Sequence, residues 1–337
     1  MNPARCSALT AAYPRLRLAL VGDFCLDRYL EIDPARAETS LETGRPVHNV
    51  VRVRSQPGAA GTILNNLAAL GVGGIALAGL CGDDGEGYEL RRALAALPGV
   101  DAEHFITAED RRTFTYCKPL LMHPGRPPEE LDRLDSKNWS PTPPAIEDRL
   151  ITSLRALVRA VDAVIVMDQV DVPDTGVVTA RARAALGELA AAFPGKLFLA
   201  DSRRGLAGWP ALAFKMNASE LAALTGRAAG TLEEVKATAA GLAARTRRPV
   251  FVTLAERGIV GAVPGAPAQH VPALPVRGPI DIVGAGDAVT ANLAAALAAG
   301  ATQVEAMELA MAAASTVIHQ LGTTGAATVA DLRSAVG

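Results

Sequence analysis

One short segment near the C-terminus combines a glycine-rich backbone with acidic side chains. It reads Asp281-Ile282-Val283-Gly284-Ala285-Gly286-Asp287, and an alanine-rich stretch that predicts a helix follows from 288 to about 299. Glycine lets the chain turn tightly, and N–H groups at a helix N-terminus favour an anion such as phosphate. A carboxylate beside an anion needs a reason, and proton transfer supplies one. Asp287 would take a proton from a hydroxyl while the N–H groups steady a phosphoryl group.

The composition of the chain limits the classes of function. Its 337 residues are 50% hydrophobic and 20% charged, with a formal net charge of -2. This balance provides no basic stripe of the kind that nucleic-acid binding requires, so we expect no nucleic-acid partner. The apolar runs 288–299 and 304–319 are too short or too interrupted by Gln and Glu to cross a membrane, so we expect no membrane partner.

The cysteines and the N-terminus suggest a location. Cys6, Cys25, Cys81 and Cys117 are far apart and have no zinc-ligand spacing, which is typical of free thiols in a reducing compartment. The N-terminus lacks the long apolar run of a secretory signal. We therefore expect a cytoplasmic protein.

From residue 145 onward, the hydrophobic pattern alternates between helix and strand. Such alternation predicts a parallel sheet covered by helices. Helices are expected at 145–160, 174–193 and 231–246, and strands at 163–168, 196–201, 213–216 and 249–254. Earlier in the chain, strands 16–21 and 75–80 and helices 62–70 and 86–97 fit the same scheme.

Two regions do not follow this alternation. Strands 47–54 and 113–122 have half-exposed patterns, and 124–144 is rich in proline and charge and suggests a surface loop. We expect the regions of about 28–56 and 104–136 to form a small separate sheet within a single domain of residues 1–337. Because open sheet edges are usually covered, we also expect a homodimer formed through this sheet.

Four motifs together resemble those of the ribokinase-like (PfkB) carbohydrate kinases. Besides 281–287, these are Gly58-Ala59-Ala60-Gly61 with Asn65-Asn66, Asn217-Ala218-Ser219-Glu220, and 252–258, in the order that the family has. The stretches 21–29, 133–135 and 321–323 resemble the heptose-phosphate kinase branch (the kinase domain of ADP-heptose synthases). The resemblance covers about residues 17–330.

The resemblance implies a fold and an activity. The fold would be a three-layer α/β/α ribokinase-like arrangement with a mostly parallel central sheet and a small β-sheet lid. The activity would be ATP-dependent transfer of the γ-phosphoryl group to a hydroxyl of a sugar or sugar phosphate, with a heptose phosphate as one candidate. In this scheme Asp287 is the general base, and Gly284, Ala285 and Gly286 form the anion hole. The alternative for Asp287 is a plain helix N-cap.

The resemblance also implies the nucleotide and cation contacts. ATP would lie near Asn217, Glu220, Thr253, Glu256 and Gly258, and Arg203 and Arg204 are further candidates for its phosphates. Glu220 would organise Mg²⁺ through water, and Asp281 would bind a monovalent cation such as K⁺. The alternatives are a capping box of Asn217 with Glu220 and an ordinary turn aspartate at 281.

On the acceptor side, the resemblance implies that Asp27 binds sugar hydroxyls, since a carboxylate accepts hydrogen bonds from neighbouring hydroxyls. The alternative is a surface pair of Asp27 with Arg28. Gly58 and Ala59 would bring the backbone close to the sugar, and Asn65 would reach a hydroxyl. For a phosphorylated sugar, Lys118 and Arg133 are the favoured cations, and Arg45, Arg52, Arg54 and Arg112 are further candidates.

Two other classes of function stay open. Gly71-Val72-Gly73-Gly74 and 284–286 loosely resemble a dinucleotide-binding turn, which would suit an NAD(P)-dependent oxidoreductase, but neither completes G-x-G-x-x-G. The second is a sugar-binding regulator without catalysis, against which the retained Asp287 and Glu220 argue. Departures from the heptose-phosphate kinase branch at 38–44 and 168–171 concern the acceptor more than phosphoryl transfer.

Overall fold

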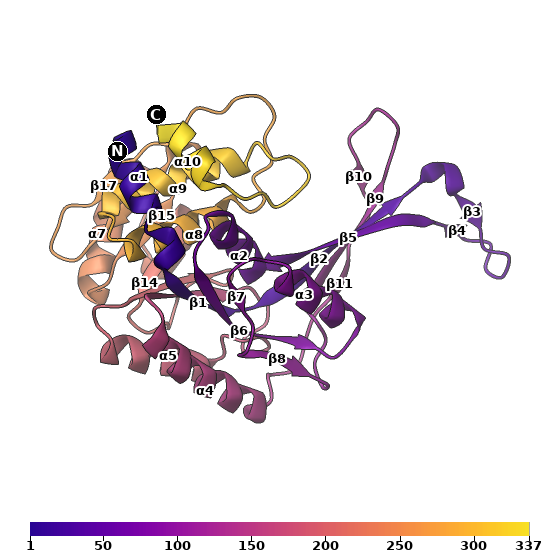
Figure 1. Ribbon diagram of the computed structural model, residues 1–337, viewed down its shortest axis with the longest axis horizontal. Helices are drawn as coiled ribbons and strands as arrows, with labels where there is room; N and C mark the ends of the chain where they lie inside the picture. Colours follow the sequence, from indigo (N-terminus) through magenta and orange to yellow (C-terminus); the bar gives the residue numbers. More distant parts are fainter. Residues whose placement is uncertain (337) are drawn as a thin grey trace.

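The computed structural model describes residues 1–336 and contains two sheets of unequal size and a short two-stranded ribbon (Figure 1). The large sheet has the strand order β17-β16-β15-β14-β13-β12-β1-β6-β7, with β8 paired to β6. Its strands are β1 (Arg17–Gly22), β6 (Gly74–Gly82), β7 (Val100–Asp101), β8 (Phe105–Ala108), β12 (Ala163–Asp168), β13 (Leu197–Ser202), β14 (Ala213–Asn217), β15 (Val250–Thr253), β16 (Ile259–Ala262) and β17 (Gln269–Val271).

The large sheet is parallel from β6 through β1, β12, β13 and β14 to β15, and only β16 and β17 are antiparallel. The mostly parallel sheet expected from the alternation of helices and strands is therefore confirmed. The helices are α1 (Pro3–Thr10), α2 (Ala60–Ala69), α3 (Gly85–Ala95), α4 (Pro144–Ala160), α5 (Ala180–Ala192), α6 (Ala218–Thr225), α7 (Leu232–Thr246), α8 (Ala285–Ala298), α9 (Gln303–Val317) and α10 (Val329–Val336), with 3-10 turns at Tyr13–Arg15, Pro34–Arg36 and Ala255–Arg257.

Two layers of helices cover the large sheet, and β1 shows why. Leu18 and Leu20 belong to the core shared with α1, α2, α8 and α9, whereas Ala19 and Val21 belong to the core shared with α4, α5 and α7. Successive side chains of a strand point to opposite faces, so a strand that is apolar at every position must be buried on both sides. The predicted three-layer α/β/α arrangement is confirmed.

The second sheet projects from one end of the large unit (Figure 1). Its order is β10-β9-β2-β5, with β11 beside β9. The strands are β2 (Phe24–Ile32), β5 (Val50–Ala59), β9 (Thr115–Leu121), β10 (Glu129–Glu130) and β11 (Leu134–Ser136), and the ribbon consists of β3 (Glu38–Thr39) and β4 (Pro46–Val47). Only Asp23 separates β1 from β2, so the chain passes directly from one sheet into the other.

Three expectations about the elements need correction. Residues 105–108 of the expected lid region instead form β8 beside β6. The stretch 124–144, expected to be a loop, contributes β10 and β11, which pair with β9. The helix expected to begin at 174 begins at Ala180, because Thr179 caps it and the preceding residues form a turn.

The helices described here do not have the length and apolar character that a membrane crossing needs.

Candidate active site

The first turn of α8 places the motif 281–287 beside the interior strand β14, since a Cβ at Gly286 would lie 3.1 Å from Lys215 Nζ. Gly284 is the N-cap residue with φ 84°, which favours glycine, and α8 starts at Ala285. Asp287 therefore lies in the first turn and is not the N-cap, so the N-cap alternative is wrong. Across residues 1–336, the N–H groups of Gly284, Gly286 and Asp287 have no protein acceptor. Gly286 and Asp287 lie within the first turn of α8, and these two donors can bind an anion at the positive end of the helix.

Ala285 does not contribute to this set of donors. Its N–H donates to the Ile282 carbonyl at 3.2 Å and closes the turn that leads into α8. In this structure that N–H is committed to the turn, and a part for Ala285 in the anion hole stays a prediction. Its role in this structure is to shape the turn.

The Asp287 carboxyl has an unusually high affinity for its proton. Burial raises its pKa to about 7, the nearby carboxylates of Asp201 and Asp27 act in the same direction, and the Lys215 ammonium opposes them. A general base works best when its pKa lies near the working pH. The structure thus supplies a carboxylate suited to proton transfer near neutrality.

Lys215 and Asp201 lie at the same site, and sequence reasoning did not identify either one. Lys215 Nζ and Asp201 Oδ2 are 2.7 Å apart, with both side chains 10% exposed. The Thr290 hydroxyl donates to the same carboxylate oxygen at 3.1 Å. The available signal was a lysine within the apolar strand 213–216, because a buried charge requires a partner.

Asn217 and Glu220 form the capping box that the sequence offered as an alternative. The Glu220 N–H donates to Asn217 Oδ1 at 2.9 Å, and the Asn217 N–H donates to Glu220 Oε2 at 2.7 Å. Burial raises the pKa of Glu220, and the carboxylate of Asp201 adds to this effect. Glu220 therefore faces the same charged region as Asp201 and Lys215, and capping still leaves its second oxygen free.

The residues of 1–336 contain no preformed cluster of three or more His, Cys, Asp or Glu side chains suited to a metal ion. Mg²⁺ is usually bound through one or two carboxylates, water and substrate phosphates. Glu220, with one uncommitted oxygen, fits that pattern.

The other predicted nucleotide and cation residues have local structural roles. Asp281 Oδ1 accepts from the Val283 N–H at 3.0 Å, as the turn alternative requires. Thr253 donates to the Met216 carbonyl at 3.4 Å. A Cβ at Gly258, where φ is 94°, would lie 2.1 Å from the Val271 carbonyl oxygen, so glycine is required there. Glu256 is exposed. Their contacts with a nucleotide or cation stay predictions.

Arg203 and Arg204 are both engaged elsewhere. Arg204 pairs with the buried Asp168 at 3.0 Å, and Arg203 pairs with Asp171 at 3.1 Å. Both guanidinium groups pair with carboxylates in this structure, and their contact with nucleotide phosphates stays a prediction.

Asp27 lies on the face of β2 opposite to Arg28. Asp27 is 4% exposed, and Arg28 pairs instead with Glu89 of α3 at 2.7 Å, so the proposed surface pair of Asp27 with Arg28 is wrong. A Cβ at Gly58 would lie 2.5 Å from Asp27 Oδ2. Glycine at 58 is therefore required for β5 to lie this close to the carboxylate.

The residue of α2 that reaches the turn at Gly284, before α8, is Thr62. A Cβ at Gly284 would lie 3.4 Å from Thr62 Cγ2, whereas Asn65 Nδ2 donates to the Pro57 carbonyl at 3.1 Å. The Nδ2 group of Asn65 thus fixes the end of β5, and the contact of Asn65 with a sugar hydroxyl stays a prediction. Sequence reasoning missed Thr62 because its place on the helix face depends on where α2 begins.

Strand register places cations in one row beyond Asp27. Tyr29 pairs with Arg54 of β5 and with Lys118 of β9, so all three share the face of Asp27. Arg54 Cζ and Lys118 Nζ lie 4.7 Å and 5.0 Å from the Tyr29 ring centre. Arg133 lies 4.7 Å from the Tyr116 ring centre, next to this row.

The carboxylates around this row hold its cations in place. Lys118 Nζ is 3.7 Å from Asp27 Oδ1, Arg54 is 2.6 Å from Glu31, and Arg133 is 2.8 Å from Asp135. Of the remaining candidate cations, Arg45 is exposed, Arg52 lies 3.9 Å from Glu31, and Arg112 lies 3.7 Å from Asp84.

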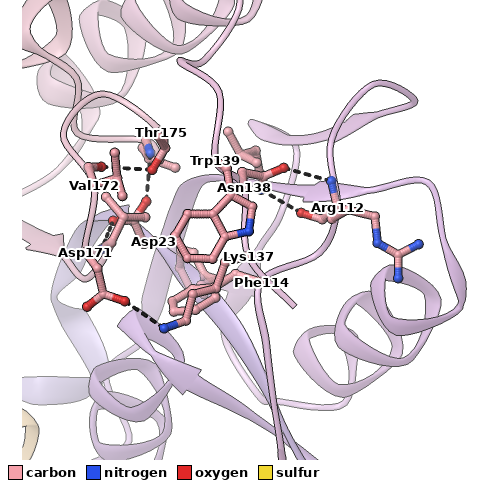
Figure 2. A pocket seen from close by; sticks show the side chains of 14 residues that line it. Asp23, Arg112, Phe114, Lys137, Asn138, Trp139, Asp171, Val172 and Thr175 are labelled. Carbon is pink, nitrogen blue, oxygen red and sulfur yellow. Dashed lines mark hydrogen bonds and ion pairs between the residues drawn. The ribbon is translucent and has the colours of Figure 1, made fainter. Parts of the chain in front are cut away.

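A pocket separate from these residues lies at the end of β1 and is lined by Asp23, Phe114, Lys137 and Trp139, among others (Figure 2). Asp23 accepts hydrogen bonds from the backbone N–H groups of Gln169, Val170 and Val177. Its burial raises its pKa to about 6. Asp23 therefore organises the loop after β12, and none of the predicted catalytic residues lines this pocket.

The sequence of this chain is similar to those of known carbohydrate kinases and their relatives. The profile of the pfkB family carbohydrate kinases matches residues 148–329. The chain is 32% identical over 328 residues to the "Bifunctional protein HldE" of Bradyrhizobium sp. (strain ORS 278), covering 96% of this chain and 64% of that protein. The HldE of Shewanella baltica (strain OS185) is 30% identical over 318 residues, covering 93% of this chain and 62% of that protein. The chain thus spans less than two thirds of these relatives.

Solved structures show the same fold. Arabidopsis thaliana ribokinase, complexed with ribose and ATP, has a TM-score of 0.65 at 19% identity, covering 95% of this chain and 97% of that chain. Phosphofructokinase-2 from Escherichia coli in complex with fructose-6-phosphate has a TM-score of 0.68 at 19% identity, covering 95% and 98%. The resemblance found in the sequence is confirmed, and the chain belongs to the pfkB family of carbohydrate kinases.

Proposed function

We propose that this sugar kinase transfers the γ-phosphoryl group of ATP to a hydroxyl of a sugar phosphate, with Asp287 as the general base. The observation that carries this proposal is the position of Asp287 in the first turn of α8. There the carboxylate adjoins two free N–H donors and is electrostatically coupled to Asp27 of the second sheet.

The reaction assigns a task to each group. The acceptor oxygen forms a bond to the γ-phosphorus while Asp287 takes the hydroxyl proton. The bond from the γ-phosphorus to the β–γ bridging oxygen breaks, and ADP leaves with that oxygen. The N–H groups of Gly286 and Asp287 stabilise the phosphoryl oxygens in transit. Asp27 orients the acceptor through its hydroxyls.

Mg²⁺ would be held near Glu220 and the nucleotide phosphates, where it would neutralise phosphate charge. Among the residues of this chain, Gly284 keeps the turn before α8 open, and Thr62 packs against that turn. Asp281 is the candidate for a monovalent cation such as K⁺, although one of its oxygens is committed to the turn.

The cation row favours an acceptor that already carries a phosphate. Arg54, Lys118 and Arg133 gather beyond Asp27 on the inner face of the second sheet. Tyr29 follows Asp27 by two residues, which is about 7 Å along a strand. A sugar held at Asp27 could therefore place a terminal phosphate among these side chains. A heptose phosphate is the first candidate, because the opening segment resembles the heptose-phosphate kinase branch and the curated relatives are named HldE.

The two rival functions are less well supported. An NAD(P)-dependent oxidoreductase would place a pyrophosphate at the turn before α8, next to a carboxylate that has no task in hydride transfer. A regulator without catalysis would have no need of a carboxylate with a pKa near neutrality beside an anion site. Family membership also favours the kinase over both.

The second sheet also offers a surface for a second copy of the chain. Its outer face has a groove lined by Leu30, Ile32, Val50, Pro119 and Leu134, and Leu134 is 64% exposed. Exposed apolar surface of this kind marks interaction sites. We infer a homodimer through this face, in a cytoplasmic enzyme. Light scattering should show a dimer at micromolar concentration and a monomer for Leu134→Asp, and a monomeric wild type would overturn the inference.

The test of function is an ADP-release screen with ATP and Mg²⁺ across free and phosphorylated hexoses, heptoses and nucleosides. We expect turnover with a sugar phosphate and much less with the matching free sugar. Asp287→Asn is the matched inactive control. Equal rates for wild type and this variant would refute the assignment of the base, and NAD(P) binding without ADP release would favour the oxidoreductase.

A further inference from the structure

One lysine ammonium is buried among the negative charges of the active site. Lys215 lies on β14, and the Asp201 carboxylate, 2.7 Å away, is its hydrogen-bond acceptor. No other acceptor occurs among the residues that the structure describes. An ammonium has three donors, so two N–H bonds of Lys215 are uncommitted. Buried donors without acceptors are costly, which suggests that a ligand supplies the missing acceptors.

The position of the ammonium indicates where that ligand lies. A Cβ at Gly286 would be only 3.1 Å from Lys215 Nζ. The N–H of Gly286 is one of the two free donors at the start of α8. Lys215 Nζ and these backbone donors therefore adjoin the same small volume, although Lys215 and Gly286 are 71 positions apart in the chain.

The surroundings keep the ammonium charged despite its burial. Burial alone would lower the pKa of Lys215, but the carboxylates of Asp201, Asp287 and Glu220 raise it. The Thr290 hydroxyl oxygen lies 3.1 Å from both Asp201 Oδ2 and the Gly286 carbonyl oxygen, so its single hydrogen is available to either acceptor. Asp201 and Thr290 thus fix the ammonium directly against the first turn of α8.

A nucleotide bound here would bring phosphate charge close to three carboxylates. Like charges in a poorly hydrated site repel strongly, whereas a fixed cation stabilises the phosphoryl oxygens. Lys215 is the lysine that the structure places at the anion-binding turn itself. That the anion bound at this turn is a nucleotide phosphate rests on the proposed function.

We propose that Lys215 is a catalytic residue that donates hydrogen bonds to the γ-phosphoryl group of ATP, and that Asp201 is the residue that positions it. Lys215 gives up no proton in the reaction. Its charge stabilises the phosphoryl group before and during transfer to the acceptor oxygen, and it returns to Asp201 alone when the product leaves. A purely structural ion pair would instead stabilise the fold without distinguishing ATP from ADP.

The test compares the affinities of ATP and ADP by titration calorimetry with Mg²⁺ and without sugar. For Lys215→Met, we expect the affinity for ATP to fall about 10-fold or more, as for the loss of a hydrogen bond to a charged group. The affinity for ADP, which lacks the γ-phosphoryl group, should change less than about 2-fold. Equal losses for both nucleotides, or no loss for either, would overturn the proposal.

Two further variants keep this test decisive. Lys236→Met, on the surface of α7 where the lysine pairs with Glu233, should leave both affinities unchanged. If Lys215→Met does not fold because Asp201 is left unpaired, the double variant Lys215→Met with Asp201→Asn removes both charges. The same selective loss of ATP affinity is expected for it. Because no sugar is present, the result stands even if the wild type phosphorylates none of the sugars in the screen.

Discussion

Asp27 and Lys118 form an ion pair with a distance of 3.7 Å on neighbouring parallel strands of the second sheet. Asp27 is buried, and Lys118 lies over the ring of Tyr29. The pair joins the carboxylate that we propose to bind sugar hydroxyls to a cation that we propose to bind phosphate, on one face of the sheet. In the proposed function, this face would recognise both ends of a phosphorylated sugar.

Replacing Lys118 should separate phosphorylated from free acceptors. For Lys118→Met, we expect the KM for a sugar phosphate to rise about 10-fold or more, because a hydrogen bond to a charged group is lost. The KM for ATP should stay the same, since Lys118 lies on β9 of the second sheet. Steady-state kinetics with each substrate varied in turn provides the measurement. An equal rise for the free sugar would show that Lys118 does not bind the phosphate.

The rate of phosphoryl transfer should depend on pH through Asp287. The base must be ionised to accept a proton, and its pKa is raised to about 7. We therefore expect kcat to fall as the pH drops below about 7 and to level off above it. A pH profile of kcat at saturating substrates checks this, and a flat profile between pH 5 and about 8 would be incompatible with Asp287 as the base.

Asp287→Asn should lower kcat by about 100- to 10,000-fold, the usual contribution of a positioned base.

The same change should stabilise the fold at alkaline pH. Because the pKa of Asp287 is higher in the folded state, the folded protein binds the proton more tightly than the unfolded chain. The ionised group therefore lowers stability increasingly as the pH rises from about 4, its unfolded value, to about 7.

Thermal unfolding at several pH values measures this second effect. The Tm of Asp287→Asn should exceed that of the wild type at pH 8, and the difference should vanish near pH 4. A variant that is less stable at pH 8 would mean that Asp287 is held by favourable contacts and not strained by burial.

Ala59 offers a prediction about stability. It is the last residue of β5 and the N-cap of α2, with φ 55° and ψ -118°, a conformation that residues other than glycine rarely adopt. Strain of this kind costs about 1–3 kcal/mol, and the extra entropy of glycine in the unfolded chain offsets about 0.5–1 kcal/mol of it. We expect Ala59→Gly to raise the free energy of unfolding by about 1 kcal/mol in urea denaturation.

Ala68 in α2 supplies the matched comparison for this change. It lies in the last turn of α2 with helical backbone, where glycine is expected to cost up to about 1 kcal/mol. If Ala59→Gly lowered stability as much as Ala68→Gly, the backbone at 59 would not be strained.

The second sheet was only partly predictable from the sequence. Its strands contain many charged residues, which suggested exposure, yet β2 is largely buried. Arg28, Asp27 and Glu31 are each paired with an opposite charge supplied by another element. Such pairing makes burial of charge tolerable, and it cannot be seen from the hydrophobic pattern of one strand.

The sequence by itself determined the parallel sheet, the helical layers and the glycine turn that leads to Asp287. These depend on local periodicity and on glycine at particular positions, which a linear pattern records. Only the tertiary structure decided that Lys215, Asp201 and Thr62 adjoin that turn and that Arg54 and Lys118 share a row with Tyr29. Contacts of this kind follow from strand order and register, which are set by the packing of the whole molecule.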